Sequence, residues 1–321
     1  MTIQKIPTRF RAYQIGACGS SFSYCAGNKF TLLEARLTAD SLHSLRQELE
    51  ICGKHDSIDV LHITSWDNDH CCLKDLEVIL EHLQPTRIEY PGYAPHSENG
   101  RNCLQVINSY KSLKSSCGKK IDAISITPDY IKSLKTAEEL RYENSLCWPK
   151  SINPNTSNDN STVKIFREGA FNVASLGDVE SENISAFLRR MKTFSREVDI
   201  MILAHHGANC ATNSKTFLEK TKPTVAICSS NYSNEYSHPR PEVHNTLHEL
   251  GIPVFTTKTG DVIIQSMPNY AQFKVTNLRA NSSEISCEKI FPIKKHHWLS
   301  MNMDTLRNIF GKQQNYRSIG R

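Results

Sequence analysis

The sequence has no apolar run of 18 residues, and residues 1–11 lack the apolar stretch that follows basic residues in a secretory signal. A chain without either feature is expected to be neither membrane-spanning nor secreted, so we expect a cytoplasmic protein. Cys-x-x-Cys pairs are also missing, although the chain holds 11 cysteines, an odd number. This cysteine usage argues against a disulfide framework and agrees with a reducing compartment.

Internal repeats and long low-complexity tracts are absent as well, which excludes a chain built from tandem repeats. What remains is a globular composition, with 321 residues of which 39% are hydrophobic. That is enough for a large core, either in one α/β domain or in one domain with an appendage. The net charge of +5 is modest, so it permits a polyanionic substrate without requiring one.

Strand and helix patterns alternate along most of the chain, which is typical of an α/β fold. Strands are predicted at 10–15, 22–25, 30–35, 58–63, 87–90, 121–126, 161–173 (a hairpin), 200–204, 224–228, 252–256 and 261–265. Helices are predicted at 39–49, 73–83, 104–113, 184–194 and 242–250. Residues 144–162 are rich in Ser, Asn and Pro, and predict a surface loop or lid between two halves.

The polar stretch from Thr64 to His70 ends one apolar strand, and a helical pattern begins directly after it. Asp67, Asp69 and His70 therefore lie just beyond the carboxyl end of a strand, where α/β proteins usually bind ligands. Two carboxylates and an imidazole suit a divalent metal. A solvated, Asp-rich helix cap would explain the same residues.

Three later strand ends also carry potential ligands: Asp178, the pair His205 and His206, and His238. Each alone has an ordinary explanation, because Asp178 could cap a helix and a histidine after a strand is often a hydrogen-bonded loop residue. Their recurrence at the ends of successive predicted strands favours one shared site.

These motifs follow the order Asp-x-Asp-His, Leu-Gly-Asp, His-His-Gly and Tyr-Ser-His-Pro, which resembles the metallo-β-lactamase fold. More narrowly, the chain resembles the hydrolase domain of the ComEC-type DNA-uptake competence protein. The resemblance covers roughly residues 10–265, and is strongest at 158–180 and 200–264. It implies an α/β fold of four layers, an αβ/βα sandwich, with metals at one edge, and we assign it to residues 1–268.

Residues 269–321 have weak periodicity and a basic bias, and we treat them as a basic C-terminal extension. Such a segment is either a solvated tail or an arm that contacts phosphates.

The resemblance implies that Asp69, His70, Asp178 and one of the two adjacent histidines bind metal, with Asp178 bridging two ions. We favour His206 over His205, because the histidine directly before glycine fills that role in the relatives. The residues expected to contact substrate are His205, Asn234, Tyr236 and Arg240.

The chain departs from the family pattern His-x-His-x-Asp-His, which reads here Ser65-x-Asp67-x-Asp69-His70. Asp67 could still coordinate, but Ser65 is a poor ligand. A site with more oxygen and less nitrogen shifts preference from zinc toward manganese or magnesium, leaves one well-held ion, or leaves none. Three neighbouring side chains are poor substitutes: His62 within its strand, His96 in a loop, and Cys71, which is expected to pack.

With metal bound, the expected chemistry is attack by an activated water. Asp69 would orient that water, as ligand or base, and His238 would protonate a leaving oxygen or bind substrate charge. His238 could equally be a hydrogen-bonded cap of the next helix. The resemblance, the oxygen-rich site and the basic tail favour phosphodiesters, so our first hypothesis is a soluble DNA nuclease, alone or with a protein partner in a larger bacterial system.

Three other hypotheses stay open. A small-molecule hydrolase of phosphoesters, thioesters or lactones would use the same ligands. A degenerate binding module without catalysis is suggested by Ser65 and Asp67. A structural or interaction protein would use the tail as its contact.

Overall fold

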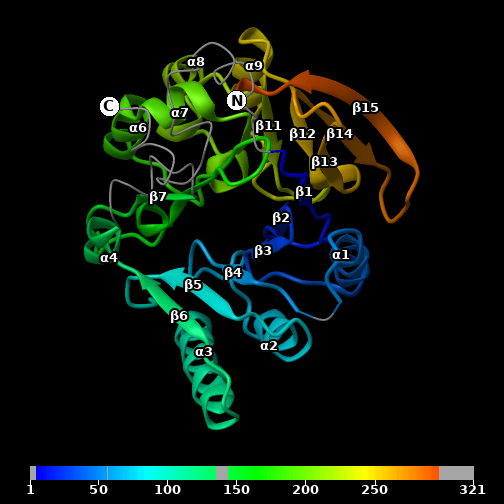
Figure 1. Ribbon diagram of the computed structural model, residues 1–321. Coiled ribbons are helices and arrows are strands. Elements are labelled where there is room, and N and C mark those ends of the chain that lie inside the picture. The colour runs from blue at the N-terminus through cyan, green and yellow to red at the C-terminus, as the bar shows by residue number, and fades with distance from the viewer. Residues whose placement is uncertain (1–4, 56, 135–143, 296–321) are drawn as a thin grey trace, which may run out of the picture.

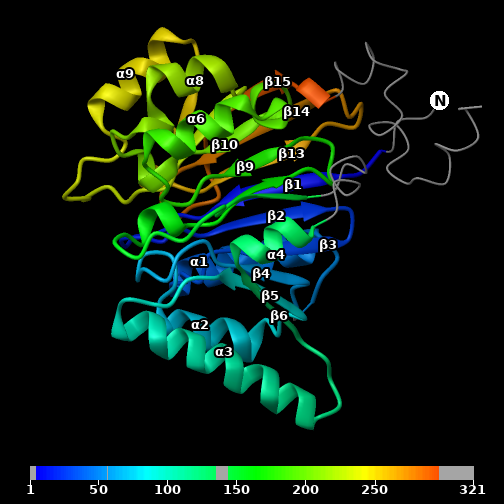
Figure 2. The same cartoon turned by 90° about the vertical axis from the view of Figure 1, so that its left-hand side faces the viewer.

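The computed structural model describes residues 5–55, 57–134 and 144–295 of the chain. These residues form two mixed β-sheets that pack face to face, with helices on both outer faces (Figures 1 and 2). Of the helices in the described ranges, none combines the length and apolar character needed to cross a lipid bilayer.

The first sheet contains nine strands among the described residues. They are β1 (Thr8–Ala12), β2 (Phe22–Ala26), β3 (Lys29–Leu33), β4 (Val60–His62), β5 (Arg87–Pro91), β6 (Asp122–Ile126), β13 (Val262–Ser266), β14 (Gln272–Leu278) and β15 (Ile285–Pro292). Their order is β15-β14-β13-β1-β2-β3-β4-β5-β6, and strands β3 to β6 run parallel to one another. The predicted hairpin of β2 and β3 turns at Gly27-Asn28, with Gly27 at a φ of 62°.

The second sheet has the order β12-β11-β10-β9-β8-β7. Its strands are β7 (Ser145–Trp148), β8 (Val163–Phe166), β9 (Val173–Ser175), β10 (Ile200–Ile202), β11 (Val225–Cys228) and β12 (Val254–Thr256). Strands β9 to β12 are parallel, so their carboxyl ends meet at one edge of the sheet.

Helices cover the outer face of each sheet. The α-helices are α1 (Ala39–Ile51), α2 (Leu73–His82), α3 (Glu98–Ser116), α4 (Pro128–Ser133), α6 (Glu182–Arg190), α7 (Lys192–Glu197), α8 (Lys215–Thr221) and α9 (Pro241–Glu249). Figure 2 shows α2 and α3 beyond the first sheet, and α6, α8 and α9 beyond the second. Short 3₁₀ turns are η1 (Asn158–Asn160), η2 (Ala204–Gly207), η3 (Ala211–Asn213) and η4 (Thr257–Thr259).

Three clusters of buried apolar side chains lie between these layers. One joins α1 to α3 with the first sheet, one joins the two sheets, and one joins the second sheet with α6 to α9. Phe10 and Phe166, for example, come from opposite sheets and belong to the same cluster. Each sheet is thus buried on both faces, which is the four-layer αβ/βα sandwich that the sequence predicted.

Some predicted elements differ from the structure. The predicted loop 144–162 contains edge strand β7, and its last three residues are buried. The predicted helix 184–194 is two helices, because Met191 has extended backbone angles (φ −73°, ψ 122°). Residues 272–278 and 285–292, within the predicted extension, continue the first sheet. The basic residues after 295 lie outside the described residues, and the domain division stays a prediction.

Candidate metal centre

Strand ends from both sheets bring four potential metal ligands together. Asp69 and His70 come from the turn after β4, Asp178 follows β9, and His206 follows β10. One ligand atom of each residue lies within 4.8 Å of all the others. The structure therefore gathers four of the five ligands predicted from the sequence, and leaves Asp67 outside the group.

The turn that presents Asp178 requires glycine before it. Gly177 has a φ of 53°, and an added Cβ would lie 2.7 Å from the Cβ of Ser161 and 3.2 Å from that of Thr64. A side chain at this position would clash with both neighbours and would hold a disfavoured backbone conformation. The Leu-Gly-Asp motif is thus a steric requirement of this strand end.

The two adjacent histidines lie on a strained turn. His205 and His206 have φ values of 45° and 53°, in the left-handed region that costs non-glycine residues about 1–3 kcal/mol each. The turn directs the two imidazoles to different partners: Nε2 of His206 lies 3.1 Å from Oδ2 of Asp69, whereas Nδ1 of His205 contacts Glu180. Strain of this kind is concentrated at functional sites.

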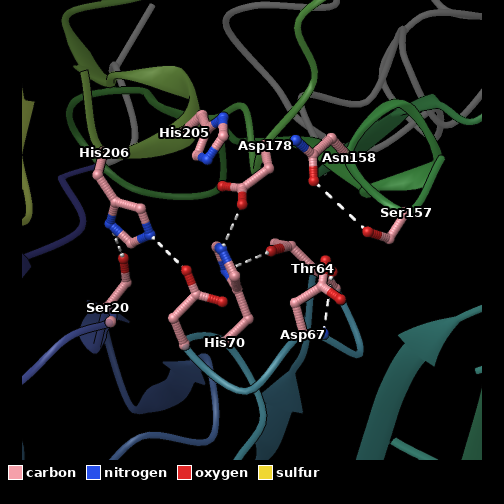
Figure 3. A network of polar contacts seen from close by, with 12 residues as sticks. Ser20, Thr64, Asp67, His70, Ser157, Asn158, Asp178, His205 and His206 are labelled. Carbon is pink, nitrogen blue, oxygen red and sulfur yellow. Dashed lines mark hydrogen bonds and ion pairs between the residues drawn. The ribbon is translucent and has the colours of Figure 1, made fainter. Parts of the chain in front are cut away.

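The environment of His206 assigns its tautomer. Its Nδ1 lies 3.0 Å from the carbonyl oxygen of Ser229, which can only accept a hydrogen bond, and 3.3 Å from Oγ of Ser20. Nδ1 must therefore donate, which leaves Nε2 for the ligand group. Figure 3 shows His206 with Ser20 on the far side of its ring from this group.

A buried carboxylate supports His70 from behind. Nδ1 of His70 lies 3.2 Å from both Oε1 of Glu34 and Oγ1 of Thr64. Glu34 accepts hydrogen bonds from the backbone N–H of Thr64 (3.0 Å) and from its hydroxyl (2.5 Å). A carboxylate behind a ligating imidazole orients the ring, so this arrangement aims Nε2 at Asp178 (Figure 3).

The donor set fits a divalent cation. Nε2 of His70 lies 2.9 Å from Oδ2 of Asp178. Even so, Nε2 of His70 and Oδ1 of Asp178 are both buried without a hydrogen-bond partner. Buried polar atoms normally have such partners, and a metal ion would satisfy both. Two imidazole nitrogens and two carboxylates form a donor set typical of transition-metal ions.

Charges in the group perturb its pKa values. Burial alone opposes the charged form of His70, but the carboxylates of Asp178, Glu34 and Asp69 outweigh burial and raise its pKa well above the ordinary value. Burial likewise opposes the ionised forms of Asp69 and Asp178, but the charges and hydrogen bonds of His70 and His206 together outweigh it and lower both pKa values. A metal ion would replace the proton of His70, so metal binding and protonation compete.

The positions where the family carries two more histidines form a separate network. Oγ of Ser65 donates a hydrogen bond to Oδ2 of Asp67 (3.0 Å) and lies 3.0 Å from the hydroxyl of Tyr93. That hydroxyl also accepts a hydrogen bond from the backbone N–H of Trp66 (3.1 Å). These contacts occupy Ser65 and Asp67 with each other, which favours one metal ion over two.

The other neighbouring side chains also lie outside the ligand group. Nδ1 of His62 is 2.9 Å from Oε2 of Glu89 inside the sandwich, and the ring of His96 lies 5.8 Å from that of Tyr93. Cys71 is buried in the core against α3, which agrees with a packing role.

A cavity of about 1080 Å³ adjoins the ligand group. Its lining includes two of the candidate ligands and all the residues predicted to contact substrate: Asp69, His206, His205, Asn234, Tyr236, His238 and Arg240. Asn234 also shapes the wall, because its side chain accepts a hydrogen bond from the backbone N–H of His238 (2.5 Å) and donates one to its carbonyl (3.2 Å).

The two cavity histidines outside the ligand group have opposite electrostatics. Burial, together with the charges of His206 and His205, lowers the pKa of His238 to about 4. A hydrogen bond with Glu180 raises the pKa of His205. At neutral pH, His238 is therefore neutral, whereas the contact with Glu180 shifts His205 toward its charged form.

Three supporting residues were not predicted from the sequence: Glu34, Glu180 and Tyr93. Glu34 is a lone carboxylate that ends an apolar strand with a φ of 68°, and this carboxylate was the one available signal. The contacts of Glu180 and Tyr93 join segments far apart in the chain, so no local pattern marks them.

Replacing Glu34 tests the support of His70. We expect Glu34→Gln to weaken metal binding by about 10–100-fold, because the supporting charge is lost while the side-chain shape is kept. The affinity is measured by competition with a chromophoric chelator. Glu180→Gln is the matched control, since it removes a carboxylate that contacts His205 outside the group. Equal losses of affinity in both variants would contradict the assignment.

Comparisons with known proteins come from sequence and from fold. No family model matches the chain. A protein named competence protein ComA, from Neisseria gonorrhoeae, is 38% identical over 58 residues, which are 18% of this chain and only 8% of that protein.

Among solved structures, the metallo-β-lactamase fold protein YhfI from Bacillus subtilis is similar at 12% identity, with a TM-score of 0.48, over 80% of this chain and 99% of that one. The metallo hydrolase Igni18 from Ignicoccus hospitalis is similar at 12% identity and a TM-score of 0.43, over 79% of this chain and 98% of that one. The layered architecture and the motif order confirm the metallo-β-lactamase fold that the sequence predicted.

Proposed function

We propose that this chain is a metal-dependent hydrolase of phosphodiesters, and that it acts as a DNA nuclease. The observation that carries the proposal is the ligand group itself, in which Nε2 of His70 and Oδ1 of Asp178 are buried without a hydrogen-bond partner beside a large cavity. We further propose, from the sequence, that the enzyme acts in the cytoplasm, alone or with a protein partner.

The candidate ligands for the metal are Asp69, His70, Asp178 and His206. A divalent cation held there would supply Lewis acidity and lower the pKa of a nucleophilic water. Asp69 is the carboxylate of this group that lines the cavity, so it is placed to orient the water, although its lowered pKa disfavours it as the base that takes the proton.

The two other cavity histidines divide the remaining roles. A general acid must hold its proton at the working pH, and the lowered pKa of His238 disfavours this role. His205, whose pKa is raised, is the better proton donor to a leaving oxygen. Neutral His238 is placed to form a hydrogen bond with substrate.

The substrate class rests on charge and on the sequence match. Arg240 and His205 line the cavity and suit the negative charge of a phosphodiester. Arg36 lies in the same lining but is paired with Asp75 (2.9 Å). The resemblance of the sequence motifs to a DNA-uptake competence protein supports DNA as the substrate, and the sequence match to a protein named competence protein ComA agrees with that resemblance.

A metal-resolved hydrolysis assay tests the proposal. The metal-free protein receives Mn²⁺, Mg²⁺ or Zn²⁺ singly, with labelled single- and double-stranded DNA and a small phosphodiester as substrates. We expect DNA cleavage that chelation abolishes and that Mn²⁺ supports better than Mg²⁺, because the ligand group combines two imidazoles with two carboxylates. Turnover of the small ester alone would indicate a small-molecule hydrolase, and the absence of both turnover and bound metal would indicate a binding module.

Testing whether the basic tail contributes to DNA binding requires a truncation that leaves the first sheet intact. Deleting everything after Gln265 would remove β14 and β15 together with the tail. Truncation after Lys295 is the appropriate variant, because it removes only residues beyond the described part of the chain. A weaker dependence of DNA affinity on salt in this variant would support a phosphate-contacting arm.

A further inference from the structure

The loop between β11 and α9 exposes two tyrosines beside the cavity. Tyr232 is 80% exposed and Tyr236 is 52% exposed. They belong to a set of seven large apolar or aromatic side chains that are exposed in the described residues. Two of the seven thus fall within five residues of one loop. Clustered exposed aromatic side chains mark surfaces that contact a partner or substrate.

A series of stacked rings connects this loop to the metal centre. The ring of Tyr236 stacks on that of His238 with centroids 5.6 Å apart and an interplanar angle of 25°. His238 stacks in turn on His206, at 6.3 Å and 12°. A planar group placed against Tyr236 would therefore continue a stack that begins at a candidate metal ligand.

Tyr232 lies farther out on the same loop. It follows Asn231, which lines the cavity, and its ring is almost fully in solvent. The loop thus presents one aromatic ring in the lining of the cavity and another outside the lining.

The charges beside these rings suit a phosphate chain. Arg240 and Arg36 line the cavity. Nη1 of Arg36 pairs with Asp75 (2.9 Å), whereas its Nε is buried without a hydrogen-bond partner. Besides Asp75, three acidic residues outside the ligand group lie nearby. Glu180 is paired with His205, Glu235 raises the pKa of the adjacent Tyr236, and Glu242 occupies the first turn of α9.

We propose that Tyr232 and Tyr236 form a stacking platform for the unpaired bases of a nucleic acid strand whose phosphate enters the metal centre. The inference rests on the proposed function and narrows its substrate to single strands or frayed ends. Aromatic rings bind successive bases by stacking on their faces, which tolerates any sequence, whereas paired bases in a duplex already stack on each other.

Binding of a labelled single-stranded oligonucleotide by fluorescence anisotropy tests the platform. We expect Tyr232→Ala and Tyr236→Ala each to weaken binding by about tenfold or more, the usual effect of losing one stacked base. Tyr232→Phe and Tyr236→Phe are the matched controls and should bind as the wild type does, because phenylalanine keeps the ring face. A strand of the same length without bases should bind equally to wild type and to the alanine variants.

The outcomes separate the platform from the function. The proposed platform is contradicted if the alanine variants bind the base-bearing strand as tightly as wild type does. It is also contradicted if they lose as much affinity for the abasic strand as for the base-bearing strand. Cleavage of DNA by wild type would leave the proposed function standing in that case. If wild type neither binds nor cleaves any strand, both proposals fail. Repeating the series with RNA of the same sequence distinguishes the two sources of unpaired bases.

Discussion

Asp178→Ala should abolish both metal binding and hydrolysis, whereas Asp67→Ala should preserve both. Asp178 is 3% exposed, lies 2.9 Å from Nε2 of His70, and has a second oxygen without a hydrogen-bond partner. It belongs to the ligand group, and Asp67 does not. The two carboxylates therefore form a matched pair, one inside the group and one beside it.

The expected loss is large because a bound metal ion would supply several kcal/mol of charge stabilisation. Metal-ion catalysis contributes several kcal/mol to the transition state, so its removal should lower the rate by about 10³-fold or more. Metal content by elemental analysis and the rate of hydrolysis are measured on the same preparations. Thermal unfolding of each variant checks that the fold is retained.

Either of two results would contradict the single-ion assignment. Loss of half the bound metal in Asp67→Ala would indicate a second ion, which the hydrogen bond from Ser65 to Asp67 argues against. Full activity in Asp178→Ala would remove the ligand group from the mechanism altogether.

The sequence predicted the site where its residues stand at strand ends. Asp69, His70 and Asp178 each follow an apolar strand, and parallel strands bring their carboxyl ends to one edge. The side-chain directions were not predictable, because they depend on contacts between distant segments. Glu34 supports His70 across 36 positions, and Tyr93 binds Ser65 across 28.

The difference between local patterns and distant contacts also explains which strands and helices were predicted from the sequence. Strands β10 and β11 are buried runs with a clear apolar signal, and both were predicted. Strand β15 is mostly exposed at the edge of its sheet, so it carries no apolar alternation to recognise. The break at Met191 was hidden because the buried side chains of α6 and α7 continue the pattern of a single helix.

Glu89→Ala should produce the largest loss of stability, about 3–5 kcal/mol, because it breaks a buried ion pair between the two sheets. Glu89 on β5 accepts hydrogen bonds from Lys164 on β8 and from Nδ1 of His62 (2.9 Å). The three side chains are at most 6% exposed, so the substitution leaves the charge of Lys164 buried without its carboxylate. Chemical denaturation at neutral pH measures the change in unfolding free energy.

An exposed pair provides the control. Lys132 and Asp129 are 3.1 Å apart, and their side chains are 67% and 91% exposed. Asp129→Ala should change the unfolding free energy little, because solvent screens such pairs. Similar losses in the two variants would mean that the buried network contributes no more than a surface contact.

The pH dependence of stability gives a second test of this network. Burial favours the neutral form of His62 and lowers its pKa. Burial also favours the neutral form of Glu89, but Lys164 and His62 outweigh this effect and hold the pKa of Glu89 well below the ordinary 4.5. Both groups bind fewer protons in the folded than in the unfolded state, so stability falls on acidification. The loss begins below the ordinary histidine value of 6.5 and steepens below 4.5. The stability difference between wild type and Glu89→Ala should therefore shrink below pH 4.5, and a constant difference down to acid pH would show that ionised Glu89 does not stabilise the sandwich.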